Sequence, residues 1–407
     1  MNELFVDLSD DQSFAHGFPH DFFTWLRKNE PIYWHEPTEI TPDGEGFWVI
    51  SRYADVNAII MDPTRFSSDK AGHRTGGGTA IKDEPTAGKV LNQTDDPHHK
   101  RLRELVNKGF TVKAVAEIET ALRDQMRMLV QALTRGEEFN FCERISREIP
   151  TQAICMVLGV PESDRLEICD WIDRGVEEQS DSVISAEYTR KLRHYGQSLI
   201  DEKRERPQDD ILSTIVHAEF EADGSTLTDF ELRSFFSLLF PAGAETTTRS
   251  ISGGMLAFLE NPSQWQRLSD DPSLIKSTVE EIVRWTTPSI YKRRTATQDV
   301  EFNGTLIRAA DKVTFWEMSA NRDEDIFEQP FEFRIDRSPN RHIGFGAGVH
   351  FCLGAALAQL ELKIVFEELI QAGIQLKLDG DPEWIPNNRL LGLKSLPVKV
   401  VDVGRRG

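Results

Sequence analysis

The sequence predicts a mainly α-helical protein with small antiparallel β-sheets. Helical periodicity dominates residues 114–219. Residues 229–240 predict a further helix that is apolar on nearly all sides, which is typical of a helix buried in the core. Strand patterns are short: residues 46–50 follow a turn signal, and residues 291–304 end in an Asn-Gly pair that favours a hairpin. The β structure is therefore expected to form small sheets.

Length and composition describe an ordinary globular chain with an acidic surface. At 407 residues the length alone suggests two or three domains. Hydrophobic residues make up 39% and charged residues 28%, which is enough apolar material for a core and too much for a disordered chain. The formal net charge of −20 disfavours nucleic acid and anionic membranes as the main partners.

The chain shows no sign of export or of a membrane span. Its first residues contain neither the basic nor the apolar segment of a secretory signal. The longest apolar run, residues 235–244, is too short to cross a bilayer. The four cysteines show no Cys-x-x-Cys spacing, which disfavours a zinc site, an iron–sulfur site and a disulfide framework. We therefore expect a cytoplasmic protein.

The most informative stretch is residues 342–354, in which three alternating glycines precede Cys352. Residues 355–363 have the composition of a helix, so this cysteine lies at a helix start. Unpaired N–H groups and the positive end of the helix dipole favour a thiolate there, and a thiolate is a metal ligand. The alternative is a buried structural cysteine after a glycine-rich turn, which is the common fate of a lone free cysteine.

Residues 95–106 predict a helix whose first turn carries basic groups. His99 and Arg103 are four residues apart and share one face of this helix. They form either a solvated basic turn or a pair of donors that binds an anion. Arg103 would give the stronger contact, because its guanidinium can hold a carboxylate through two hydrogen bonds.

Polar residues interrupt the apolar helix at residues 241–248, which include Glu245 and three threonines. Such groups are costly in a core helix unless they are paired or functional. Pro241 removes a helical hydrogen bond and threonine hydroxyls compete for backbone carbonyls, so we expect a kinked or opened turn that forms a groove. The alternative is a kinked helix whose threonine hydroxyls bond back to the preceding turn.

Five segments resemble, in order, motifs of the cytochrome P450 family of haem-thiolate monooxygenases. Residues 345–354 carry Phe-x-x-Gly-x-His-x-Cys-x-Gly, which resembles the family's haem-binding loop. Asp-x-Pro-x-His-x-x-x-Arg at 95–103 is similar to its haem-propionate helix, and 242–246 matches its (Ala/Gly)-Gly-x-(Asp/Glu)-Thr pattern. Glu-x-x-Arg at 281–284 and the tail segment 390–398 are similar to its Glu-x-x-Arg motif and its closing hairpin.

The resemblance implies a single domain over residues 1–407, in place of the several domains suggested by length. It would have a β-rich N-terminal portion at about 30–90, a helical body at about 94–380 and a C-terminal hairpin at about 385–402. The haem would lie between a long central helix and the loop that carries the cysteine. Pro241 departs from the family, which commonly has a straight-chain apolar residue there.

The resemblance also implies the residues that bind haem. Cys352 would be the axial ligand of the haem iron. Donors to the haem propionates would come from the 95–103 helix, a strand and the cysteine loop, and they are His99, Arg103, Arg294 and His350. Arg293 competes with Arg294 for this role.

Two further groups of residues receive roles from the resemblance. Glu245 and Thr246 would be catalytic, with Glu245 feeding protons and Thr246 bonding to the iron-bound oxygen. A structural network that fixes the cysteine loop would consist of Glu281, Arg284 and Arg337.

The expected function is that of a monooxygenase that contains haem b and uses O2 to hydroxylate a C–H bond of a hydrophobic small molecule. Residues 106–111, 281–285 and 319–323 are similar to the bacterial branch that acts on sterols, terpenoids and branched lipids. Electrons would come from NAD(P)H through a ferredoxin reductase and a ferredoxin. Two alternatives are a peroxide-driven peroxygenase, which would lack the Glu245–Thr246 pair, and a non-catalytic haem sensor or carrier.

Overall fold

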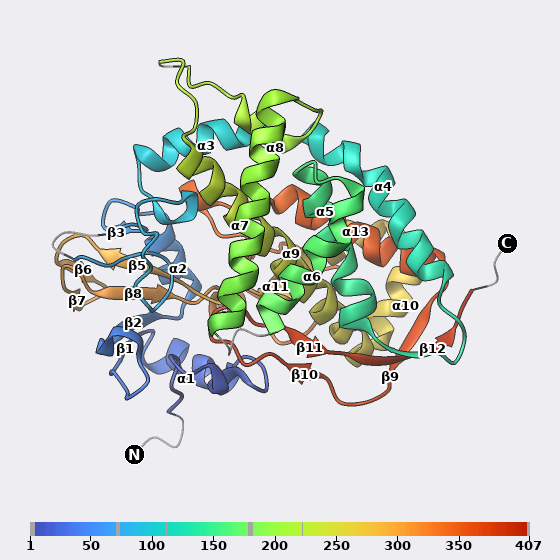
Figure 1. The fold of residues 1–407 in the computed structure, drawn as a ribbon. Helices are drawn as coiled ribbons and strands as arrows, with labels where there is room; N and C mark the ends of the chain where they lie inside the picture. Colours follow the sequence, from blue (N-terminus) through green and yellow to red (C-terminus); the bar gives the residue numbers. More distant parts are fainter. Residues whose placement is uncertain (1–4, 71–73, 111, 178–181, 222, 405–407) are drawn as a thin grey trace.

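Helices make up most of the molecule (Figure 1). The computed structural model describes residues 5–70, 74–110, 112–177, 182–221 and 223–404. Over these residues the α-helices are α1 (His20–Asn29), α2 (Tyr53–Ile60), α3 (His98–Gly109), α4 (Val112–Gln131), α5 (Glu148–Val157), α6 (Glu162–Glu177), α7 (Ser182–Glu205), α8 (Ile211–Val216), α9 (Asp229–Glu260), α10 (Pro262–Asp270), α11 (Ile275–Thr286), α12 (Glu317–Ala320) and α13 (Ala355–Gln371). The predicted mainly helical class is confirmed.

The strands are short, as predicted. They are β1 (Ile32–His35), β2 (Phe47–Ile50), β3 (Phe66–Ser67), β4 (Glu138–Asn140), β5 (Lys292–Ala296), β6 (Val300–Phe302), β7 (Thr305–Ile307), β8 (Lys312–Phe315), β9 (Gln375–Leu378), β10 (Glu383–Trp384), β11 (Leu393–Ser395) and β12 (Pro397–Asp402).

The largest sheet joins the N-terminal strands to strands from late in the chain. Its order is β1-β2-β8-β5-β3, and Figure 1 shows these blue and orange strands side by side. β2 and β8 run parallel, so this sheet is mixed, whereas the prediction was of antiparallel sheets. A parallel pair needs a long connection, and here most of the helical body lies between the two strands. The pairing places β5 beside the cysteine loop.

The two predicted hairpins are both present. β6 and β7 are joined by Asn303 and Gly304, which have φ values of 49° and 81° and so suit an Asn-Gly turn. Near the C-terminus β10 pairs with β11, slightly earlier than expected. β12 instead pairs with β4 and β9, so the end of the chain closes a second sheet.

α9 is the central helix and packs against α5, α7, α11 and α13. It begins with a capping box, in which Thr228 and Glu231 each accept from the other's backbone N–H. A Cβ on Gly254 would lie 2.9 Å from the side chain of Ile282, so glycine allows α11 to approach closely. α9 stays α-helical across Pro241. The opened turn expected there is not formed, because the proline removes one hydrogen bond and the flanking turns keep theirs.

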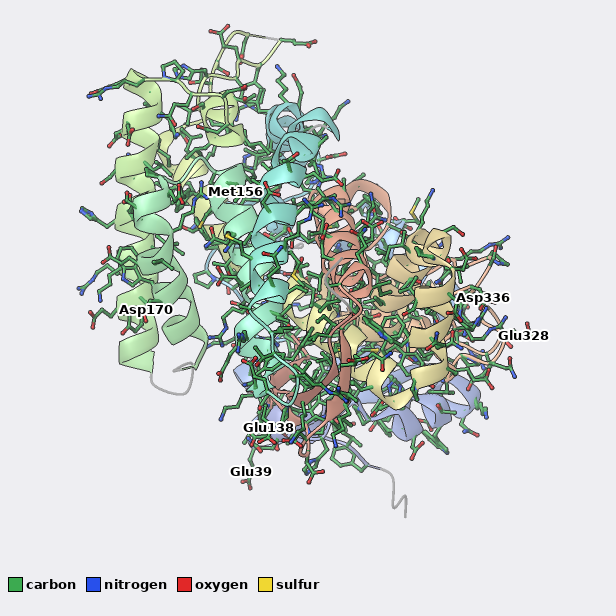
Figure 2. All side chains as sticks on the ribbon, turned by 90° about the vertical axis from the view of Figure 1, so that its right-hand side faces the viewer. Glu39, Glu138, Met156, Asp170, Glu328 and Asp336 are labelled. Carbon is green, nitrogen blue, oxygen red and sulfur yellow. The ribbon has the colours of Figure 1, made fainter. Side chains whose placement is uncertain are left out.

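The surface carries the acidic charge. Figure 2 shows Glu39, Glu328 and Asp336 at the outer edge of the molecule. Over the described residues, no helix is both long enough and apolar enough to cross a membrane.

Candidate functional site

The cysteine loop is held by its own backbone. The N–H of Cys352 donates to the carbonyl of Phe345 at 2.9 Å, which folds the loop back on itself. Gly346 and Gly348 have φ values of 71° and 64°, a left-handed conformation that favours glycine. α13 begins at Ala355, so the cysteine precedes a helix as the sequence predicts.

The electrostatics of the cysteine differ from the expectation. Burial raises the pKa of the Cys352 thiol above its usual value, and this outweighs the opposing effects of the Gly354 N–H, Lys292 and Arg103. The helix start alone therefore does not produce a thiolate. A bound metal ion would favour the thiolate form of this cysteine.

α3 brings two basic side chains to the loop. The ring centroid of His99 lies 4.2 Å from that of His350. One turn later, Arg103 donates from Nη2 to the carbonyl of Phe351 at 2.8 Å. The pKa of His350 is lowered to about 2 by burial and by the neighbouring cations, foremost Arg294. Both histidines and both arginines thus surround the residues just before the cysteine.

The two candidate arginines lie on opposite faces of β5, because successive side chains of a strand point to alternate faces. Arg294 is buried and lies over the ring of Phe315, 5.2 Å from its centroid, with its Nη1 donating only to a backbone carbonyl. Burial lowers the pKa of Arg294 to about 10. Arg293 points to the other face, where its Nη1 donates to Asp83 at 2.7 Å. Of the two, Arg294 therefore joins the cysteine cluster.

The cluster fits a group with two carboxylates. The Nε2 atom of His99 is buried and has no hydrogen-bond partner. Arg103 and Arg294 form no ion pair with a carboxylate in the described part of the chain. A buried cation, Arg294, a partly exposed one, Arg103, and an unsatisfied imidazole nitrogen beside a thiol are more than a bare metal ion requires. They match haem, which has an iron and two propionates.

Lys292 and Glu317 are part of this site although the sequence did not indicate them. Lys292 is two residues before Arg294 on β5 and so shares its face, and its Nζ forms an ion pair with Glu317. The period of two along a strand could have identified the lysine. Glu317 could not be found in this way, because only the pairing of β5 with β8 brings it near.

On α9 the proposed catalytic residues make local contacts. The side chain of Glu245 is largely buried and its Oε2 lies 3.6 Å from Nη2 of Arg249. Burial raises the pKa of Glu245, and Arg249 opposes this. The hydroxyl of Thr246 donates to the carbonyl of Ala242 at 2.8 Å. This agrees with the alternative prediction, in which the threonine hydroxyls bond to the preceding turn of the helix.

A cavity of about 680 Å³ borders Glu245 on α9. Its walls come from α9, from the start of α5 and the turn before it, and from the β10–β11 hairpin. Charged side chains in the wall include Glu143, Arg147, Arg249 and Lys394. The cavity therefore places several charged side chains in the same wall as the carboxyl of Glu245.

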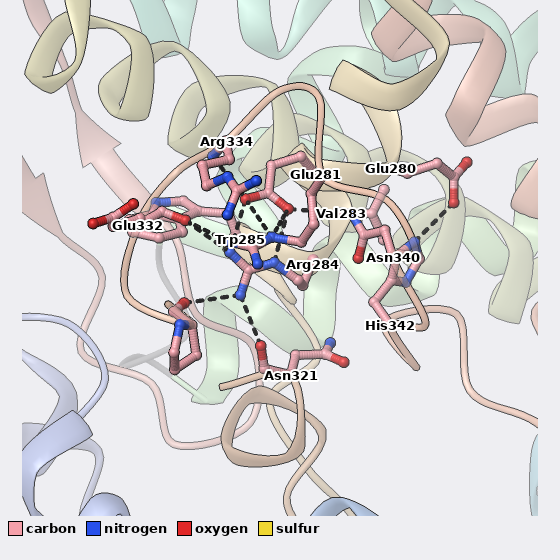
Figure 3. A network of polar contacts seen from close by, with 12 residues as sticks. Glu280, Glu281, Val283, Arg284, Trp285, Asn321, Glu332, Arg334, Asn340 and His342 are labelled. Atoms are coloured by element: carbon pink, nitrogen blue, oxygen red, sulfur yellow. Dashed lines mark hydrogen bonds and ion pairs between the residues drawn. The ribbon is translucent and has the colours of Figure 1, made fainter. Parts of the chain in front are cut away.

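A third group of predicted residues forms a closed network (Figure 3). Arg284 donates from Nε and Nη2 to the two carboxylate oxygens of Glu281, each at 2.8 Å, and Arg337 donates from Nε at 3.1 Å. Asn340 and the backbone N–H of Arg334 donate to the same carboxylate. Arg284 and Arg337 also donate to backbone carbonyls. These belong to Asn321, Glu328, Gln329, Pro330 and Glu332.

This network borders the start of the cysteine loop. Asn321 accepts from the N–H of Ile343 at 2.9 Å, and its backbone carbonyl accepts from Arg284. His342 pairs with Glu280 at 2.9 Å, so it lies near the network and not among the propionate donors. The loop is thus anchored at one end by the network and at the other by α13.

A family model described as cytochrome P450 matches residues 164–401. A protein of Mycobacterium tuberculosis provisionally named cytochrome P450 126 is 45% identical over 406 residues, which cover 97% of both chains. The chain belongs to the cytochrome P450 family. It is therefore an enzyme of a monooxygenase family whose cofactor is haem, as the motifs predicted.

Other relatives of this P450 are named for hydrophobic substrates. A steroid C26-monooxygenase of Rhodococcus jostii is 34% identical, with 96% of this chain and 84% of that protein covered. A methyl-branched lipid omega-hydroxylase of M. tuberculosis is 36% identical, with 92% and 90% covered.

Solved structures confirm the P450 fold. The P450 PksS of the Bacillus subtilis bacillaene polyketide synthase is 31% identical, covers 98% of this chain and 100% of its own, and gives a TM-score of 0.87. Mycobacterium marinum CYP268A2, solved with pseudoionone, is 35% identical, with 93% and 94% covered and a TM-score of 0.84.

Proposed function

We propose that residues 1–407 form a single-domain, cytoplasmic P450 that binds haem b through Cys352 and hydroxylates a C–H bond of a hydrophobic small molecule. The observation that carries the proposal is the presence beside the cysteine of two cations without an ion-pair partner within the described ranges, the buried Arg294 and the partly exposed Arg103. Arg103 and Arg294 have no carboxylate partner among the described residues, and two propionates would balance them. When bound, the haem supplies the activation of O2.

The residues around the cysteine would hold and orient this cofactor. Arg103 and Arg294 would each pair with a carboxylate, and His99 would donate from its unpartnered Nε2. His350 already has a contact at its Nε2, 3.0 Å from the hydroxyl of Ser68, which leaves its Nδ1 for a carboxylate. The network of Glu281, Arg284 and Arg337 would keep the loop in place.

Glu245 and Thr246 would move protons at the central helix. Because burial raises its pKa, the carboxyl of Glu245 holds a proton more readily than an exposed glutamate. Water in the adjoining cavity would reload it, and Arg249 would keep the carboxyl in place. The hydroxyl of Thr246 would pass on a proton once it leaves the carbonyl of Ala242.

Steroids, terpenoids and methyl-branched lipids are the substrate classes that we favour. The named steroid and branched-lipid relatives, each about one-third identical over most of this chain, support them. We propose that electrons reach the haem from NAD(P)H through a ferredoxin reductase and a ferredoxin, because the chain has no Cys-x-x-Cys motif for an iron–sulfur centre of its own.

The absorption spectrum of the reduced carbon monoxide complex tests the proposal. We expect a thiolate-type band from the purified protein and its loss in Cys352→Ala, with the fold retained by circular dichroism. An imidazole-type band in the unaltered protein, or no bound haem, would contradict the proposal. Spin-state titrations with a steroid, a terpenoid and a methyl-branched fatty acid would then rank the substrate classes.

A further inference from the structure

Lys292 lies with the proposed propionate donors and yet has no assigned role. It shares a face of β5 with Arg294, two residues away, and its side chain is 33% exposed. Its positive charge acts on both His350 and Cys352, so its ammonium group lies close to the cysteine loop. An ammonium has three N–H donors, and the contact with Glu317 uses one of them.

Glu317 is a buried acid in contact with the same loop. Its side chain is 1% exposed, and its Oε2 pairs with Lys292. The other oxygen, Oε1, is buried without a hydrogen-bond partner and lies 3.8 Å from the position that a Cβ on Gly346 would take. A buried carboxylate with an unsatisfied oxygen is costly, and a purely structural ion pair would be expected to satisfy both oxygens.

The pair of Lys292 and Glu317 leaves the net charge of the site unchanged. Arg103 and Arg294 have no ion-pair partner among the described residues, although the carboxylate of Asp95 acts on Arg294 from a distance, so both guanidinium groups can still bind propionates. Lys292 therefore adds hydrogen-bond donors beside Arg294 without adding net charge. Glu317 holds the ammonium at the loop and places a negative charge near the cysteine.

We propose that Lys292 is a further haem-carboxylate ligand and that Glu317 is its positioning residue, so that the pair also adjusts the reduction potential of the iron. This inference rests on the proposed function of the site. A cation near the iron favours the reduced state and an anion favours the oxidised state. Removing each partner alone must therefore shift the potential in opposite directions.

The test measures haem loss to an excess of apomyoglobin and the midpoint potential of the haem-loaded protein. In Lys292→Met we expect haem to dissociate about tenfold faster, as for the loss of a charged hydrogen bond, and the potential to fall. Lys292→Arg should restore the slow dissociation. In Glu317→Gln the potential should rise, and haem loss should be faster than in the unaltered protein but slower than in Lys292→Met, because the ammonium is still present but held less firmly.

Lys312→Met is the matched control. Lys312 is buried in the same sheet, on β8, and its Nζ pairs with Asp43 at 2.8 Å, away from the cysteine loop. Its loss should lower the unfolding temperature without changing haem loss or potential. If Lys292→Met does not load haem because Glu317 is left unpaired, the double variant with Glu317→Gln removes that charge and should still lose haem faster.

Two results would overturn the inference: Lys292→Met behaving like Lys312→Met, or both single variants shifting the potential in the same direction. Either would make the pair a structural ion pair. Failure of the proposed function looks different, because the unaltered protein would then lack haem or its thiolate-type band.

Discussion

Two groups of arginines flank the cysteine loop, and they differ in how their charges are balanced. In the network of Glu281, Arg284 and Arg337, one carboxylate and a set of backbone carbonyls satisfy both guanidinium groups. In the cluster of Arg103 and Arg294, no carboxylate pairs with either cation over the described residues. Arg284, Arg337 and Arg294 are buried, and Arg103 is partly exposed.

The difference separates a structural role from a binding role. A buried ion pair whose hydrogen bonds are complete has no free donor and no uncompensated charge with which to bind a ligand. Buried cations without a counter-charge cost free energy in the protein alone, and a dianionic ligand regains it. Charge balance therefore supports the proposal that the cluster of Arg103 and Arg294 holds the cofactor.

The largest effect is expected in the closed network. Glu281→Gln leaves two buried guanidinium groups without their counter-charge, which should cost about 3–5 kcal/mol of unfolding free energy. Urea unfolding followed by circular dichroism measures this. Asp299→Asn, in an exposed pair with Arg308, is the control and should cause no measurable change. Equal stability of the two variants would show that the network is not structural.

Arg294→Met should have the opposite effect on the two forms of the protein. The haem-free chain loses an unpaired buried cation, so its urea midpoint should stay the same or rise. Haem loss to apomyoglobin should become about tenfold faster or more, because a charge-assisted hydrogen bond to a propionate is gone. A haem-free chain that is strongly destabilised, with unchanged haem loss, would place Arg294 among the structural arginines.

A smaller effect concerns His20, which borders the closed network. Burial and the nearby Arg322, Arg27 and Arg284 lower its pKa well below 6.5. The unfolded chain therefore takes up a proton that the folded chain does not, so stability falls as the pH drops below 6.5. His20→Phe should lose less unfolding free energy between pH 7 and pH 5, as measured by urea titrations. An unchanged slope would contradict this assignment.

Much of the site could be predicted from sequence because its motifs are local. The spacing of His99 and Arg103 on one helix face, and the position of Cys352 before a helix, follow from the helical period and hold in the structure. The roles of these residues in binding haem stay predictions. The prediction of an open turn at Pro241 was wrong, because α9 stays helical there. The sequence shows that a proline removes one hydrogen bond, but it does not show the packing that keeps the helix intact.

The sequence by itself determined the family, the helical class and the order of the motifs, since each depends on residues close together in the chain. Only the tertiary structure showed that Arg293 pairs with Asp83 and that Arg294 lies on the other face of β5. Only the tertiary structure buries Cys352, which raises the pKa of its thiol although the start of a helix would lower it. The tertiary structure also brings Lys292 into an ion pair with Glu317. Burial and charge balance arise from contacts between distant segments, which no local pattern contains.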